Sequence, residues 1–331
     1  MTSTHPLDPP RTPSAEPPEP LAYHRLARER PTYRWWRPLA VGATALGFYL
    51  ALLLVALIGL MIASVLVPGI EQGVDGFYAS ETLDLNDPAT LVLSLGSIAL
   101  MLPALWLATR VLGTRPVGLL SSVAGRLRWT WLLWCVAVAI LVQLVAQGIF
   151  LLLPATGTEA TPMYDGGRTL AVLAAALLLV PIQAAAEEYV FRGYLMQSLG
   201  GWLRHPAFAI LLPIPLFVVG HDYELLGQID IAVFALAAGW LTWRTGGLEA
   251  ALALHIVGNT TIFVLVAFGA ADANADDLHV GDLLASLAMT AVFVLVITRL
   301  AAARGIQRTR RPSAPRPAQL PAPAQFPAET P

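Results

Sequence analysis

The side chains of this sequence that could do chemistry are few, and they interrupt long apolar blocks. A charged side chain at the centre of a bilayer costs at least about 2.5–3.5 kcal/mol, so such a residue needs a partner or a function. The interrupting residues fall in the segments AAAEEYVFRGYL, LFVVGH and HIVGN, and they are Glu187, Glu188, Arg192, His221, His255 and Asn259. Their types predict a polar site inside an apolar protein.

Spacing divides the charged residues of the first segment. Glu188 and Arg192 are four residues apart, so on a helix they share a face and can form an ion pair. Glu187 lies about 100° around the same helix and has no cation at that spacing. A carboxylate without a cation in apolar surroundings suits a general base that works near neutral pH. We therefore predict Glu187 as the base and Glu188 as a structural residue.

The other two segments repeat the four-residue spacing. His255 and Asn259 present an imidazole and an amide on one helix face, and Phe217 and His221 have the same separation. Counted along their helices, Glu187, His221 and His255 all reach the middle of a bilayer. We expect a water-holding cavity between the helices that carry them.

Two chemistries fit this set of side chains. Without a metal, Glu187 and His221 would polarise a water that attacks a peptide carbonyl, while His255 and Asn259 donate hydrogen bonds to the oxyanion. With a divalent metal such as zinc, Glu187, His221 and His255 would be the ligands. The sequence lacks HExxH, the usual helical zinc motif, which favours the metal-free version and keeps the metal as an alternative.

The elements that must position these residues are membrane helices. Of the 331 residues, 56% are hydrophobic and only 13% are charged, and a bilayer core needs about 20 apolar residues per helix. The apolar blocks lie at 39–67, 89–112, 129–153, 169–198, 207–221, 229–243, 248–268 and 282–303. We predict an all-α, polytopic helical bundle of about eight spans with a central intramembrane polar cavity.

Charge and cysteine content exclude other classes. The single cysteine, Cys135, cannot form an internal disulfide, and a net charge of −2 is not that of a nucleic-acid binder. With eight spans and the N-terminus inside, only Arg168 of the 20 arginines falls on the outer side. The positive-inside rule then predicts both termini in the cytoplasm. The arginine-only basic set and the richness in alanine and leucine point to the plasma membrane of a bacterium.

Composition also predicts the domain organisation. Residues 1–38 are rich in proline and arginine and should form a disordered cytoplasmic tail, and residues 304–331 should form another. The membrane domain spans 39–303. Within it, residues 113–128 are expected to lie as an amphipathic stretch on the cytoplasmic leaflet, and His24 in the first tail is expected to be solvated.

The three motifs, taken in this order, resemble one family. The pattern EExxxR, then FxxxH, then HxxxN is similar to that of the CPBP intramembrane proteases, which comprise the type II CAAX prenyl endopeptidases and the bacterial Abi proteins. The similarity covers about residues 115–268. It implies an eight-helix architecture with both termini inside, and a protease active within the membrane. The segment FVVGH departs from the FGxxH of many bacterial members.

The resemblance also implies roles for individual residues. The first glutamate of the pair acts as the base together with the histidine of FxxxH, and the HxxxN pair supports the oxyanion. In this sequence the catalytic positions are Glu187, His221, His255 and Asn259, and the supporting positions are Glu188, Arg192 and Phe217. The resemblance leaves metal dependence open.

These observations predict an intramembrane endopeptidase of the CAAX-processing or Abi type. Its partners would be a membrane-anchored or hydrophobic peptide or protein substrate and the lipid bilayer, and no nucleic acid. The alternative is a non-catalytic bacteriocin-immunity protein or membrane scaffold that retains the motif, because fold and motif do not guarantee activity. A proton-coupled transporter is less favoured, because the hydropathy pattern shows no internal repeat.

Overall fold

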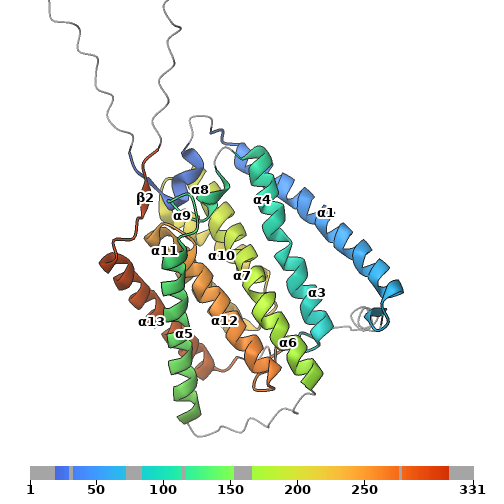
Figure 1. The fold of residues 1–331 in the computed structure, drawn as a ribbon. Helices are drawn as coiled ribbons and strands as arrows, with labels where there is room; N and C mark the ends of the chain where they lie inside the picture. The colour runs from blue at the N-terminus through green and yellow to red at the C-terminus, as the bar shows by residue number, and fades with distance from the viewer. Residues whose placement is uncertain are drawn as a thin grey trace, which may run out of the picture.

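A computed structural model describes residues 19–29, 33–71, 84–113, 116–152, 166–275 and 278–312 (Figure 1). These residues form a bundle of helices with one two-stranded sheet. The helices are α1 (Arg37–Leu66), α3 (Pro88–Ala99), α4 (Met101–Leu112), α5 (Trp129–Leu152), α6 (Gly166–Leu178), α7 (Val180–Glu188), α8 (Met196–Trp202), α9 (Pro206–Leu211), α10 (Pro213–Val219), α11 (Leu225–Thr245), α12 (Glu249–Ala267) and α13 (Val280–Ala303). Short elements are the 3-10 helices η1 (Tyr23–Arg28) and η2 (Val117–Leu120), the π-helix η3 (Tyr189–Leu195), and the strands β1 (Leu21–Ala22) and β2 (Thr309–Arg310).

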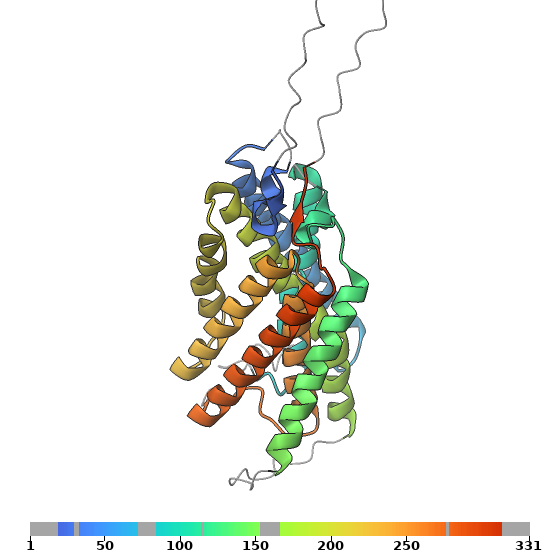
Figure 2. The ribbon, with the colours of Figure 1, turned by 90° about the vertical axis from the view of Figure 1, so that its left-hand side faces the viewer.

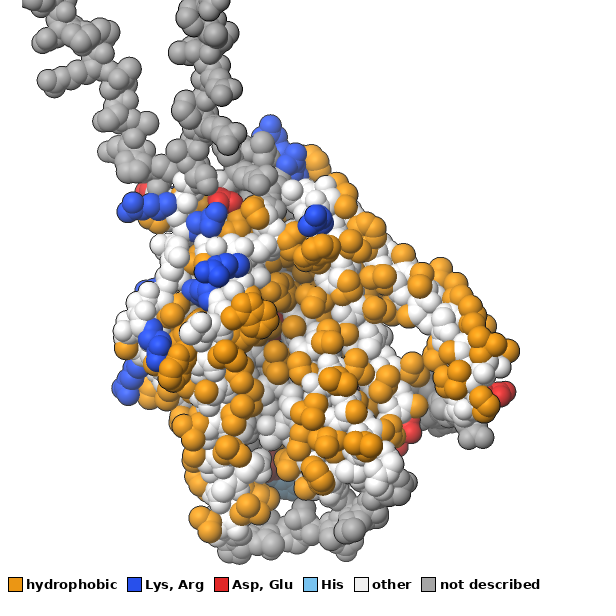
Figure 3. All heavy atoms as spheres, in the orientation of Figure 1, with side chains coloured by type: hydrophobic (Ala, Val, Ile, Leu, Met, Phe, Trp, Pro, Cys, Tyr) orange, Lys and Arg blue, Asp and Glu red, His pale blue; other side chains and the backbone are white. Residues whose placement is uncertain are grey.

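The all-α, multi-pass architecture predicted from hydropathy is confirmed. Within the described residues, seven helical stretches are long and apolar enough to cross a membrane. The predicted fifth span, 207–221, is the shorter stretch formed by α9 and α10, which Pro213 interrupts after Leu212. Figure 3 shows hydrophobic side chains covering the bundle along its length, as expected of a surface that faces lipid.

The predicted sixth span, 229–243, is shorter than the helix observed. α11 runs from Leu225 to Thr245 and includes the polar residues Gln228 and Asp230 near its start. Asp230 lies in its second turn and is hydrogen-bonded by Ser286 of α13, which compensates for the carboxylate inside the bundle.

α12 lies at the centre of the bundle. It packs against α5, α6, α7 and α11. Figure 1 shows it among these helices, whereas α1 lies at the right-hand edge of the bundle. Buried small residues, including Ala250, Ala251 and Ala253, allow the neighbouring helices to approach α12 closely. This central position makes α12 a rigid support for the side chains that it carries.

At the end of the bundle away from η1 and β2, two loops are joined by matching Asp-x-Asn turns (Figure 1). Asn86 donates its amide to Asp272 at 2.6 Å, and Asn274 donates its amide to Asp84 at 2.7 Å. In return, Leu85 donates its backbone N–H to the Asn274 side-chain oxygen at 2.8 Å. The start of α3 is thereby held to the connection between α12 and α13.

The expectation that residues 1–38 are wholly disordered is wrong for the described part of that segment. η1 packs on α8, and the side chains of Tyr23 and Leu26 are fully buried there. β1 pairs antiparallel with β2, with Leu21 opposite Arg310, so part of the second predicted tail is ordered too. Figure 2 shows η1 and β2 together at one end of the bundle. Residues 1–18 and 313–331 lie outside the described residues.

His24 is buried and not solvated as predicted. Its Nε2 lies 3.1 Å from the Arg204 carbonyl oxygen. Burial lowers the pKa of His24 below its ordinary value of 6.5, and the nearby positive groups Arg25 and His205 act in the same direction.

Docking of η1 is therefore expected to weaken in acid. The pKa of His24 is lower when η1 is docked, so the undocked segment binds the proton more readily. The stability of the docked state is therefore lost as pH falls through 6.5. The protection of residues 21–29 against hydrogen exchange, corrected for the pH dependence of the intrinsic exchange rate, should be lower at pH 5.5 than at pH 7.5, and His24→Asn should remove most of that difference. Equal protection at both pH values in the wild type would contradict this account.

The middle of the segment expected to lie on the leaflet, residues 119–123, is buried in the protein. The Leu119 carbonyl accepts from Gln197 at 2.8 Å, and the Leu120 carbonyl accepts from the Tyr23 hydroxyl. The Ser121 carbonyl accepts from the Leu248 backbone N–H at 2.8 Å. Partners from three distant parts of the chain thus satisfy this backbone, which permits its burial.

A buried ion pair fixes the start of α12. Arg128 donates to both carboxylate oxygens of Glu249, at 2.8 and 2.6 Å, and Glu249 is fully buried. The same guanidinium also donates to the carbonyls of Thr245 and Gln307. The Arg128 guanidinium thereby joins four parts of the chain, which are α5, α11, α12 and the segment before β2.

Glu249→Gln is expected to lower the free energy of unfolding by about 1.5–3 kcal/mol, because it weakens two charge-assisted hydrogen bonds. Thermal unfolding in detergent micelles would measure the change. Glu19→Gln is the matched control, because the Glu19–Arg204 pair is almost fully exposed and separated by 3.9 Å. Equal stability of Glu249→Gln and wild type would show that the buried pair makes no net contribution.

Candidate active site

The candidate residues come from one continuous helical stretch and two neighbouring elements. Glu187 and Glu188 end α7, and the chain continues directly into the π-helix η3, which carries Arg192. π-turns within α-helices occur frequently at functional sites. α12 supplies His255, and α10 supplies Phe217.

Glu188 links the cluster together. Its Oε1 accepts from Arg192 Nη1 at 2.7 Å and from His255 Nδ1 at 2.9 Å. The ion pair expected from the four-residue spacing is therefore present, and Glu188 and Arg192 are both buried. The bond to His255 could not be seen in the sequence, because it joins α7 to a helix 67 residues later.

His255 lies between the two glutamates. Its Nε2 is 3.5 Å from Glu187 Oε2, while its Nδ1 bonds Glu188. A carboxylate only accepts, so Nδ1 carries a hydrogen. Glu187 Oε2 itself has no hydrogen-bond partner among the described residues. The buried His255 ring is thus fixed by Glu188 on one side and faces the free oxygen of buried Glu187 on the other.

Two aromatic rings enclose the guanidinium. Arg192 lies over Phe217, with 4.4 Å from its Cζ to the ring centroid, and over Phe234 of α11 at 5.4 Å. The Phe234 ring also contacts the His255 ring edge to face, at 4.9 Å. These cation–π and ring contacts orient the charged groups in an apolar wall. Sequence reasoning missed Phe234, a lone aromatic residue that no motif marks.

His221 lies just beyond the end of α10 and is oriented by that helix. Its Nδ1 is 2.7 Å from the Phe217 carbonyl oxygen, and its ring is 4.7 Å from the Phe217 ring. A carbonyl only accepts, so Nδ1 donates, and the Nε2 of neutral His221 is left as an acceptor. The contacts that connect it with Glu187 run through Phe217 and His255, whose rings are 6.2 Å apart.

Asn259 follows His255 by one turn on α12 and is half-buried. None of the hydrogen bonds found among the described residues involves its side chain. Its amide is therefore available to a ligand on the face of α12 that carries His255.

The structure brings only part of the predicted metal set together. His255 Nε2 lies 3.5 Å from Glu187 Oε2, while its Nδ1 donates to Glu188, an outer partner that a ligating histidine commonly has. His221 is connected with these two through Phe217, and within the described ranges no group of three or more His, Cys, Asp or Glu side chains is placed to hold an ion. The metal stays a prediction, and no step is derived through it.

Sequence reasoning also missed Tyr223 beside His221, and Asp230 of α11, whose charge acts on Tyr223. The ring of Tyr223 stacks on that of His221, at 6.3 Å and 18°. Partial burial, and then the negative charges of Asp230 and Glu187, raise the pKa of Tyr223, although 39% of the residue remains exposed. Searching for ionisable residues within apolar blocks, which found Glu187, could also have found Asp230. No comparable signal marks Tyr223.

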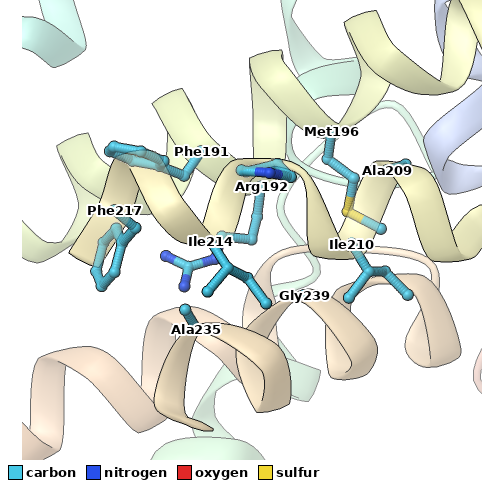
Figure 4. Close-up of a pocket in the computed structure, with 10 residues that line it drawn as sticks. Phe191, Arg192, Met196, Ala209, Ile210, Ile214, Phe217, Ala235 and Gly239 are labelled. Carbon is cyan, nitrogen blue, oxygen red and sulfur yellow. The ribbon is translucent and has the colours of Figure 1, made fainter. Parts of the chain in front are cut away.

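The cluster borders an apolar pocket between η3, the α9–α10 pair and α11. Figure 4 shows the Arg192 guanidinium directed toward Phe217, Ile214 and Ala235 in this pocket. Arg192 Nη2 has no hydrogen-bond partner among the described residues. The charged cluster is therefore closed on this side by hydrocarbon.

Comparisons with known proteins agree with the geometry. Residues 168–261 match the family described as "Type II CAAX prenyl endopeptidase Rce1-like", and every candidate residue lies within this range. The chain is also 26% identical over 239 residues to "Uncharacterized protein YyaK" of Bacillus subtilis (strain 168), covering 70% of this chain and 78% of that protein. No solved structure matches the chain significantly. The comparisons confirm, for the segment that carries the site, the resemblance to the type II CAAX prenyl endopeptidases, and at family level they support an intramembrane protease.

Proposed function

We propose that this protein is an intramembrane endopeptidase in which Glu187 activates a water that attacks a peptide bond. The observation that carries the proposal is the buried arrangement of Glu187, His255 and Glu188, in which two carboxylates hold one imidazole between them. Burying these ionisable side chains among apolar helices costs free energy, which favours a functional role for them. Their geometry suits proton transfer.

The steps follow from the atoms that the side chains present. In this scheme His255 donates from both nitrogens, through Nδ1 to Glu188 and through Nε2 to the substrate, and Glu187 acts as the base. Glu187 takes a proton from the water, whose oxygen bonds to the carbonyl carbon, while His221 Nε2 accepts the water's other hydrogen in a hydrogen bond. His255 Nε2–H and the Asn259 amide donate to the oxyanion. As the carbon–nitrogen bond breaks, Glu187 returns its proton to the leaving amine.

This scheme uses no metal. The position of the site also indicates the class of substrate and the side of the membrane on which the chain ends lie. The substrate is a membrane-anchored or hydrophobic peptide or protein, because the site lies among apolar helices. The pairing of β1 with β2 supports both ends of the described chain being on one side. The arginine distribution supports that side being the cytoplasm, and the arginine-only basic set with the Ala/Leu-rich composition supports the plasma membrane of a bacterium.

The test is a comparison of protein termini in membranes that carry wild type or Glu187→Ala at matched levels. New termini that occur only with wild type would support the proposal and identify the substrate and cut site. Glu19→Gln, which changes an exposed carboxylate, should give the wild-type termini. Wild-type termini should also persist with a chelator present. Identical termini with wild type and Glu187→Ala would contradict a protease and favour a non-catalytic role.

A further inference from the structure

The imidazole of His221 lies outside the helices, so its orientation depends on its contacts. It follows Gly220 in the connection between α10 and α11. One nitrogen is fixed by the Phe217 carbonyl at 2.7 Å, and one ring contact comes from Phe217 at 4.7 Å with an interplanar angle of 42°. Both of these contacts come from the preceding helix. A histidine held from one side only can still rotate about its side-chain bonds.

Tyr223 supplies a second ring contact, from the side of the connection that leads into α11. Its ring is nearly parallel to that of His221, at 18° and 6.3 Å between centroids, within the range of offset ring pairs. The short connection between α10 and α11 brings the two rings together.

α11 in turn determines where Tyr223 lies. A Cβ on Gly227 would be 2.7 Å from the Tyr223 Cβ and 3.1 Å from its Cγ. The base of the tyrosine side chain therefore occupies the space that the missing Gly227 side chain leaves on the first turn of α11. Gly227 is buried and the nearest atom is the Tyr223 Cβ, not the end of a flexible side chain, so a methyl group at Gly227 would displace the tyrosine from its base.

We propose that Tyr223 is a positioning residue: its ring, seated on Gly227, holds the His221 imidazole so that Nε2 points to the reacting water. The ring and not the hydroxyl does this, because the contact is between ring faces. The part that concerns the reacting water rests on the proposed function, whereas the contact with His221 does not.

The first test follows the His221 ring directly, without any cleavage reaction. Full-length protein in detergent micelles would carry ¹⁵N- and ¹³C-labelled histidine, with the His221 signals identified from their loss in His221→Asn. In Tyr223→Ala and Gly227→Ala these signals should broaden or move toward those of a mixture of tautomers. Tyr223→Phe should keep the wild-type signals, as should Gly148→Ala, a matched control with nothing within 4 Å of the added methyl group. Unchanged His221 signals in Tyr223→Ala would overturn the proposal.

The second test uses the cut site found by the comparison of termini. Tyr223→Ala and Gly227→Ala should lower kcat roughly three- to tenfold, the size of one aromatic contact, with KM little changed. Tyr223→Phe should retain the wild-type kcat. A loss in Tyr223→Phe equal to that in Tyr223→Ala would overturn the proposed ring contact in favour of the hydroxyl. If wild type cleaves nothing, the proposed function fails, and the histidine signals still decide whether Tyr223 positions His221.

Discussion

Replacing Glu187 by glutamine is expected to lower kcat by about 10²- to 10⁴-fold, the usual contribution of a positioned general base. The amide keeps the shape of the side chain but cannot take a proton from water. Glu187 Oε2 has no hydrogen-bond partner among the described residues, so the substitution leaves the packing almost unchanged. The protein should therefore insert and unfold like wild type.

The measurement is cleavage of the peptide defined by the wild-type cut site, with purified protein in detergent micelles. Asp222→Asn is a suitable control, because it changes an exposed carboxylate beside His221 without entering the buried cluster. It should keep kcat within a few-fold of wild type. Cleavage by Glu187→Gln at the wild-type rate would refute Glu187 as the base.

The second large effect concerns stability. Glu188→Ala is expected to lower the free energy of unfolding by about 3–5 kcal/mol, the cost of breaking a buried pair from one side. The substitution leaves the Arg192 guanidinium buried without its partner and removes the acceptor for His255 Nδ1. Arg192 is held between two aromatic rings, so it cannot easily turn toward water.

Thermal unfolding in the same micelles would compare Glu188→Ala with Glu187→Gln. The double variant Glu188→Leu/Arg192→Leu should recover much of the lost stability, because it removes both charges together, yet it should not cleave. A Tm for Glu188→Ala equal to that of wild type would show that the pair does not stabilise the protein. Loss of stability in Glu187→Gln but not in Glu188→Ala would reverse the two roles.

The membrane helices were predictable because the bilayer imposes their length. A span needs about 20 apolar residues whatever surrounds it, and the predicted blocks 39–67, 129–153 and 248–268 agree with α1, α5 and α12 within a few residues. The prediction failed where partners change the cost of a polar residue. α11 continues through Asp230 because Ser286, on another helix, bonds the carboxylate.

The segments outside the spans were predicted less well, because their burial also depends on partners that are distant in the sequence. Composition predicts disorder near the N-terminus, yet Tyr23 is buried and bonds the Leu120 carbonyl. The partners that permit this burial lie about a hundred residues away in the chain. Local composition contains no information about them.

The contacts of the candidate site also fall into two groups: those within one helix, which were predictable, and those between helices, which were not. Four-residue spacing on one helix was enough to predict the Glu188–Arg192 pair, because helix geometry alone brings the two side chains together. Which helices face one another depends on the packing of the whole bundle. Only the tertiary structure places His255 between Glu187 and Glu188, Phe234 beside Arg192, and Tyr223 against His221. The sequence by itself determined the spans and the residue types of the site, and the packing of α7, α10, α11 and α12 decided which of those residues contact one another.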